Sequence, residues 1–147
     1  MTKFDEIGLN LCELQANLFV ESLKYDISSY QFIKKYMFSE AASLMDDKKF
    51  FSLSTKGFSF EIDSKAKGNI KINSSILYWV GYIYRYWAYT YGISSKEIYK
   101  IISGKELCLL YEPYHTLDPA MAIERIYESK NITKKDKLEL LKEIYKK

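Results

Sequence analysis

An arginine surrounded by aromatic side chains is the first feature of this sequence that could do chemistry. Arg85 lies within residues 76–91, which hold six of the chain's 14 tyrosines and both of its tryptophans. A guanidinium group binds carboxylates and phosphates through forked hydrogen bonds and stacks on rings, so this setting indicates an anion or nucleotide site. The alternative is a structural role, in which Asp118, Glu112 or a carbonyl at a helix C-terminus holds an internal Arg85.

The single histidine is the second candidate. His115 lies in an expected loop, 112–117, directly before Asp118 and Pro119, which have the residue types of a helix N-cap and first helical position. An imidazole can act as a general base when a carboxylate orients it. Arg85, His115 and Asp118 are therefore the candidate catalytic residues of a small enzyme or nucleotide-binding protein. Hydrogen-bonded packing of His115 among tyrosines is the competing interpretation.

Other kinds of site find no support in the residue types. One histidine and two separated cysteines, Cys12 and Cys108, do not make a zinc ligand set. The sequence also lacks a glycine-rich phosphate loop, a nucleophile elbow and a paired-acid motif. We therefore expect no metal and no cofactor, and both cysteines are interpreted as buried thiols in a reducing, cytoplasmic compartment.

Residues 76–91 predict a helix that carries rings on both sides. At 3.6 residues per turn, aliphatic side chains and Trp87 take one face, while tyrosines and Arg85 take the opposite one. Such a helix must be surrounded by its own domain or by a partner. Tyrosine, tryptophan and arginine are also the residues that anchor protein interfaces. The candidate partner-binding residues are Tyr78, Trp79, Tyr82, Arg85, Tyr86 and Tyr89.

A helix-turn-helix-like pair is the sharpest spacing pattern. Four residues have the relative positions of its small residue, turn glycine and core aliphatics: Ala88, Gly92, Ile98 and Ile101. Its second helix, 94–103, would face a DNA groove. The candidate DNA-binding residues are Ser95, Lys96, Tyr99 and Lys100. Few phosphate-binding cations flank them and Glu97 intrudes, so packing for stability is the favoured interpretation.

The elements that would position these residues form one mainly α domain of about six to seven helices over residues 1–147. Helices are expected over about 4–25, 28–46 with a bend near Ser39, 74–91, 94–103, 105–111, 118–130 and 133–147, the last being basic and amphipathic. The insert at about 50–73 breaks the pattern. Its glycines and alternating apolar residues predict a small β-hairpin or an extended arm.

Capping residues set the expected helix boundaries. Gly92 should end the aromatic helix in the left-handed conformation, and Ser74 or Ser75 should cap its start. Ser94 is expected to cap the next helix, and Gly104 to end it.

Length and charge limit the class of protein. The 147 residues fit one soluble domain, with 48% apolar and 28% charged residues. A net charge of +3 is too small to indicate nucleic acid by itself, and seven lysines lie between Lys130 and Lys147. The aromatic segment is too short and too polar to cross a bilayer, so we expect no membrane contact, and the N-terminus does not resemble a signal peptide.

Three segments together, 29–46, 78–87 and 111–126, resemble a family of small bacterial proteins of toxin–antitoxin and phage-defence gene neighbourhoods. The resemblance covers most of the chain except the insert and the lysine-rich end. It implies an antitoxin or immunity-type protein that binds and neutralises a partner protein, a toxin encoded by an adjacent gene. DNA is the alternative partner, which a DNA-binding variant would contact through residues 88–103. The resemblance supplies no catalytic residue and no oligomeric state.

Overall fold

The computed structural model describes residues 1–47 and 70–130, which are mainly helical. Its elements are α1 (Glu6–Glu21), the 3-10 turn η1 (Ser22–Lys24), α2 (Ser29–Met37), α3 (Glu40–Asp46), α4 (Ser74–Tyr91), α5 (Ser95–Ile101), α6 (Gly104–Leu109), α7 (Tyr111–Tyr114) and a helix over 119–130. These two ranges contain no strand, which confirms the mainly α prediction. The predicted hairpin or extended insert lies outside the described residues except for 70–73, and the predicted helix at 133–147 lies wholly outside them.

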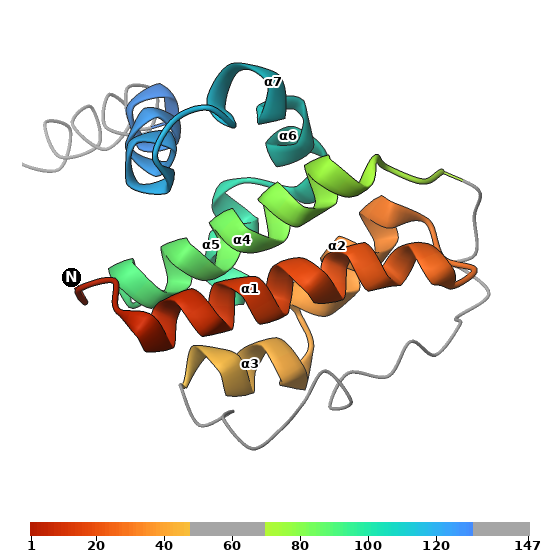
Figure 1. Ribbon diagram of the computed structural model, residues 1–147, viewed down its shortest axis with the longest axis horizontal. Coiled ribbons are helices and arrows are strands. Elements are labelled where there is room, and N and C mark those ends of the chain that lie inside the picture. Colours follow the sequence, from red (N-terminus) through yellow and green to blue (C-terminus); the bar gives the residue numbers. More distant parts are fainter. Residues whose placement is uncertain (48–69, 131–147) are drawn as a thin grey trace, which may run out of the picture.

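α4 is the central helix of the fold. Figure 1 shows α4 lying alongside α1, with α6 and α7 on its other side, and α5 also packs against it. The aromatic helix is therefore surrounded mostly by its own domain. Its largest buried side chains are Trp87, Arg85, Tyr84, Leu77 and Ile83.

α1 and α4 approach closely because Gly81 has no side chain. A Cβ atom at this position would lie 2.9 Å from Phe19 Cγ and 3.0 Å from Ala16 Cα. Such distances are shorter than van der Waals contact, so only glycine allows the two backbones to pack this closely. This approach decides which side of α4 is buried and which side remains accessible.

The C-terminal boundary of α4 is the predicted one, but its start differs by one or two residues. Gly92 has φ +67° and its N–H donates to the Ala88 carbonyl, which confirms the left-handed cap. Asn73, rather than Ser74 or Ser75, caps the start, because its Oδ1 accepts a hydrogen bond from the Ser75 N–H at 2.8 Å.

The boundary between α5 and α6 corrects the prediction for Gly104. Ser94 caps α5 as expected, with its Oγ accepting from the Glu97 N–H. Gly104 does not end a helix: it is the first residue of α6. Ser103 and Glu106 form a reciprocal capping box there, a signal that the sequence contains three residues apart. Gly104 is also needed for packing, because a Cβ would lie 2.7 Å from Ile33 Cγ2.

The expected bend near Ser39 is confirmed as a break between α2 and α3. Ser39 Oγ accepts a hydrogen bond from the Ala42 N–H at 3.1 Å and so caps α3. Residues 70–73 are attached to the start of α2 by two hydrogen bonds. The Ser29 N–H donates to the Ile70 carbonyl, and the Ile72 N–H donates to Ser29 Oγ. The described helices share one core, with side chains from α1, α2, α3, α4, α5, α6 and the 119–130 helix.

Candidate functional site

Arg85 lies in the core, with 1% of its surface exposed. Its Nε and Nη2 donate to Gln15 Oε1 at 2.9 and 2.7 Å, and its Nη1 donates to Asp46 Oδ1 at 2.6 Å. The expected structural partners, Asp118 and Glu112, are not the ones that hold it. The paired charges and forked geometry are those of a structural arginine.

The hydrogen bonds around Arg85 form a network that joins five helices. The Ser95 N–H and Oγ–H donate to the Asp46 carboxylate at 2.8 and 2.7 Å, which ties α5 to α3. The Tyr36 hydroxyl donates to Gln15 Oε1 at 2.9 Å, and Gln15 Nε2 donates to the Gly81 carbonyl at 2.9 Å. Among the described residues, no buried side-chain nitrogen or oxygen lacks a hydrogen-bond partner. The network is therefore complete without a ligand.

Sequence reasoning missed Gln15, Tyr36 and Asp46 as partners of Arg85. Gln15 gave a usable signal, because it is a polar residue between the apolar positions Leu11 and Leu18 on one side of a helix, and it is fully buried. A buried amide in an apolar stripe requires polar partners in another element. Asp46 gave no such signal, because it belongs to a run of charged residues that is typical of a solvent-exposed segment.

The exposed stripe of α4 carries three tyrosines in a row. The ring centroids of Tyr78 and Tyr82 lie 6.4 Å apart and those of Tyr82 and Tyr86 6.5 Å apart, with the planes tilted by 25° and 21°. Phe4 extends the row, since its centroid is 4.5 Å from that of Tyr86. Tyr78 is 37% exposed, and the other two tyrosines are half-buried. Together Tyr78, Tyr82 and Tyr86 are called the tyrosine row.

The hydroxyl groups of the tyrosine row make no hydrogen bond to any residue of 1–47 or 70–130. Buried tyrosine hydroxyls are normally paired within the protein, as those of Tyr36 and Tyr84 are here. The free hydroxyls of the row are thus available to water or to a partner.

Two of the predicted partner-binding residues are not accessible. Arg85 is in the network described above, and Tyr89 is 5% exposed, with its hydroxyl donating to Asp5 Oδ1 at 2.6 Å. Both lie on the side of α4 that α1 covers. Trp79 is half-buried, and its ring meets the Tyr111 ring edge-on at 5.9 Å. Tyr78, Trp79, Tyr82 and Tyr86 therefore remain as candidates for contact.

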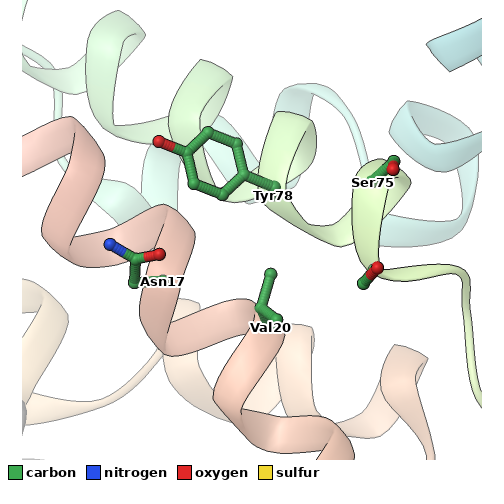
Figure 2. Close-up of a pocket in the computed structure, with 5 residues that line it drawn as sticks. Asn17, Val20, Ser75 and Tyr78 are labelled. Atoms are coloured by element: carbon green, nitrogen blue, oxygen red, sulfur yellow. The ribbon is translucent and has the colours of Figure 1, made fainter.

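A depression lies at one end of the tyrosine row, between α1 and the start of α4. Its volume is about 390 Å³, and it is lined by Asn17, Val20, Ser74, Ser75 and Tyr78. Figure 2 shows Val20 and Tyr78 pointing into the space between the two helices. The lining combines the aliphatic Val20, the ring of Tyr78 and three small polar side chains.

Acidic groups lie beside the tyrosine row. Burial raises the pKa of Tyr82 to about 12, and the neighbouring Cys12 and Glu13 add to this effect. Burial is also the largest cause of the raised pKa of Tyr86, and the charge of Asp118 is the next. The hydroxyls of the row are therefore neutral hydrogen-bond donors at pH 7.

His115 stacks on the ring of Tyr111. Their centroids are 4.3 Å apart with an angle of 11° between planes, and His115 Nδ1 is hydrogen-bonded to the Tyr111 carbonyl at 2.7 Å. The expected loop here is partly helical, because 111–114 form α7. Asp118 caps the 119–130 helix, with Oδ1 accepting from the Ala120 N–H at 2.9 Å. The three candidate catalytic residues thus have separate local partners, and no hydrogen bond, ion pair or ring contact within residues 1–47 and 70–130 joins Arg85 to His115.

The DNA-binding candidates are divided by burial. Ser95 is 1% exposed and belongs to the Arg85 network, so it cannot reach a DNA groove as expected. Lys96 and Lys100 are exposed on α5, and Tyr99 is half-buried with its ring edge-on to Phe38 at 5.5 Å. DNA contact through Lys96, Tyr99 and Lys100 stays a prediction.

The helix-turn-helix-like pair itself is a packed unit. Ala88 and Ile98 are buried between α4 and α5 as the spacing predicts. Ile101 is half-buried, and Ile102 occupies the core instead. The Tyr84 hydroxyl donates to the Ile102 carbonyl at 2.8 Å, which fixes the end of α5 against α4.

Both cysteines are free and buried, as interpreted from the sequence. Burial raises the pKa of Cys12 to about 12 and that of Cys108 to about 11, so neither thiol forms a thiolate at neutral pH. In residues 1–47 and 70–130 no three His, Cys, Asp or Glu side chains gather as metal ligands. No helix in these ranges has the length and apolar character to span a bilayer.

Comparison with known proteins finds no matching family model, no matching curated protein and no matching solved structure.

Proposed function

We propose that this protein is a cytoplasmic antitoxin or immunity-type protein that binds and neutralises a partner protein through the tyrosine row. The observation that carries the proposal is the row itself: three rings at the surface of an otherwise buried helix, with free hydroxyls. Tyrosine supplies a large, rigid contact area with few side-chain torsions to restrict, and its hydroxyl adds a directional hydrogen bond. The resemblance of three segments to proteins of toxin–antitoxin neighbourhoods supports the same proposal.

Neutralisation would be stoichiometric occlusion of the partner's active site. This mode needs no reactive group, which agrees with the use of Arg85 in the buried network and of His115 in a stacked pair. Trp79 and the depression beside Tyr78 extend the contact area beyond the row. Large aromatic anchors with a neighbouring pocket are typical of the central residues of protein interfaces.

The test is co-expression with the product of the adjacent gene, followed by size-exclusion chromatography with mass detection and a growth assay for each gene alone. We expect a complex of fixed stoichiometry and growth rescue by this chain. Tyr82→Ala should abolish both, whereas Phe38→Ala, which removes an exposed ring outside the row, should leave both intact. Toxicity of this chain alone, absence of a complex, or equal effects of the two substitutions would overturn the proposal.

A further inference from the structure

The charged residues of α1 and of the 106–124 stretch are all acidic. α1 contributes Glu6, Glu13 and Glu21, and the sequence has no lysine or arginine between Lys3 and Lys24. The only charged residue of α4 is the buried Arg85. From Glu106 to Glu124, covering α7 and Asp118, the sequence again contains acids and no lysine or arginine.

Two of these carboxylates act on the row: Glu13 is exposed on α1 one turn before Asn17, which lines the depression with Tyr78, and Asp118 caps the 119–130 helix through Oδ1. Glu13 raises the pKa of Tyr78 and Tyr82, and Asp118 raises that of Tyr86, in each case in addition to burial. Neither Glu13 nor Asp118 forms an ion pair with any residue of 1–47 or 70–130. Ring faces are electron-rich, so rings near carboxylates that lack an ion-pair partner attract cations.

The lysines are found on other elements. Lys34 on α2 and Lys96 and Lys100 on α5 are exposed, and α2 and α5 pack on one another. Exposed lysines therefore lie on α2 and α5, whereas the exposed charges of α1 are acidic. Figure 1 shows α5 behind α4 in the view in which α1 and α4 lie side by side.

We propose that the tyrosine row receives a cationic segment of the partner protein, whose arginine or lysine side chains lie on the rings and pair with Glu13 and Asp118. The proposal rests on the proposed function and specifies the chemistry of the occupant. Cations bind the faces of aromatic rings and form charge-assisted hydrogen bonds with carboxylates, so the row and its two acids act on the same group. The free hydroxyls of the row provide further acceptors for a guanidinium group.

An acidic or purely apolar segment would leave Glu13 repelled or desolvated without a counter-charge, which disfavours it.

The decisive experiment compares two substitutions with the same change of net charge in the complex with the adjacent gene product. Glu13→Lys inverts the charge beside the row, and Glu97→Lys does so on α5, where the residue is also exposed. We expect Glu13→Lys to raise Kd about tenfold, chiefly through slower association, and Glu97→Lys to change it less than about twofold. The wild-type Kd should also rise between 50 mM and 500 mM salt, and more steeply than that of Glu13→Lys.

The outcomes separate this inference from the proposed function. Loss of binding in Tyr82→Ala with no effect of Glu13→Lys would keep the row as a protein-binding site and overturn the cationic occupant. If the adjacent gene product does not bind at all, the protein alone is titrated with an arginine–leucine helical peptide and with its glutamate–leucine counterpart, and ring resonances of Tyr78, Tyr82 and Tyr86 are followed by NMR. Saturable shifts with the arginine peptide alone, lost in Glu13→Lys, would support the inference, and their absence would overturn it.

Discussion

At the scale of single residues, Arg85 shows how a charge is kept inside a small helical domain. Its guanidinium is held by Gln15 and Asp46, and the same Asp46 carboxylate accepts two hydrogen bonds from Ser95. A buried ion pair gives little net stability relative to apolar residues of the same volume, but losing one partner leaves the other charge uncompensated. The network therefore fixes the relative position of α1, α3, α4 and α5 more than it adds free energy.

The first prediction concerns this pair. Arg85→Met should lower the free energy of unfolding by about 3 kcal/mol, because Asp46 would stay largely buried without a cation. The matched control is Lys130→Met, which removes the more exposed ion pair with Glu106 and should cost less than about 1 kcal/mol. Urea unfolding of both variants, with unchanged slope in denaturant, measures the difference. Equal losses would contradict the structural role of Arg85.

A second residue-scale prediction follows from the buried tyrosines. Burial raises the pKa of Tyr36 to about 12 and that of Tyr84 well above its usual value, against about 10 in the unfolded chain. Above pH 10 the unfolded chain loses these protons and the folded protein keeps them, so stability is full below pH 10 and falls as the pH rises toward 12. Each such group adds a slope of about 1.4 kcal/mol per pH unit.

Urea midpoints measured from pH 8 to pH 11 test this dependence. Tyr36→Phe should be less stable than wild type at pH 8, because the hydrogen bond to Gln15 is lost. Between pH 10 and 11 its stability should nevertheless fall less steeply than that of wild type. The same steepness in both proteins would show that Tyr36 ionises normally in the folded state.

At the scale of elements, the contact of α1 with α4 determines which rings are exposed. Gly81→Ala should destabilise the protein by about 2 kcal/mol, although alanine favours helix, because the new methyl group would collide with Phe19 and the Ala16 backbone. Ser75→Ala in the same helix, at an exposed position, should change stability by less than about 0.5 kcal/mol. Thermal unfolding of the two variants gives the comparison, and a Gly81→Ala protein as stable as wild type would disprove the close packing.

Local signals predicted the elements well because they act within a few residues. The apolar periodicity of 4–25, the left-handed Gly92 and the break at Ser39 all depend on neighbouring positions, and the structure confirms them. The prediction that Gly104 ends a helix was wrong, because the capping box of Ser103 and Glu106 is a stronger signal for a helix start than a lone glycine is for a helix end.

The candidate site could be predicted only in part, since its accessibility depends on contacts between distant segments. The six aromatic and arginine candidates share one helix, but sequence periodicity alone does not say which side α1 covers. Tyr89 and Arg85 are buried against α1, whereas Tyr82 and Tyr86 keep part of their surface exposed. The partners of Arg85 lie 39 and 70 residues away along the chain, beyond the reach of any local pattern.

At the scale of the whole molecule, both tryptophans lie on the central helix but on surfaces with different exposure. Trp87 is fully buried, with its Nε1–H donating to the Tyr127 hydroxyl at 2.8 Å, whereas Trp79 is half-buried next to the tyrosine row. One therefore reports on the fold and the other on the proposed interface. Since α4 contacts α1, α5, α6 and α7, loss of the Trp87 signal should coincide with loss of helical circular dichroism in a single unfolding transition.

The last prediction uses this difference to locate a bound partner. Binding at the tyrosine row should shift the emission of Trp79 to shorter wavelength and protect it from acrylamide, because its half-exposed ring becomes buried, while Trp87 should not respond. Trp79→Phe should therefore remove most of the binding signal and Trp87→Phe should keep it, provided that a partner without tryptophan, or one with its tryptophans replaced, is used. A binding signal that survives in Trp79→Phe and disappears in Trp87→Phe would place the partner away from the row, on a face whose contact changes the packing of the core around α4.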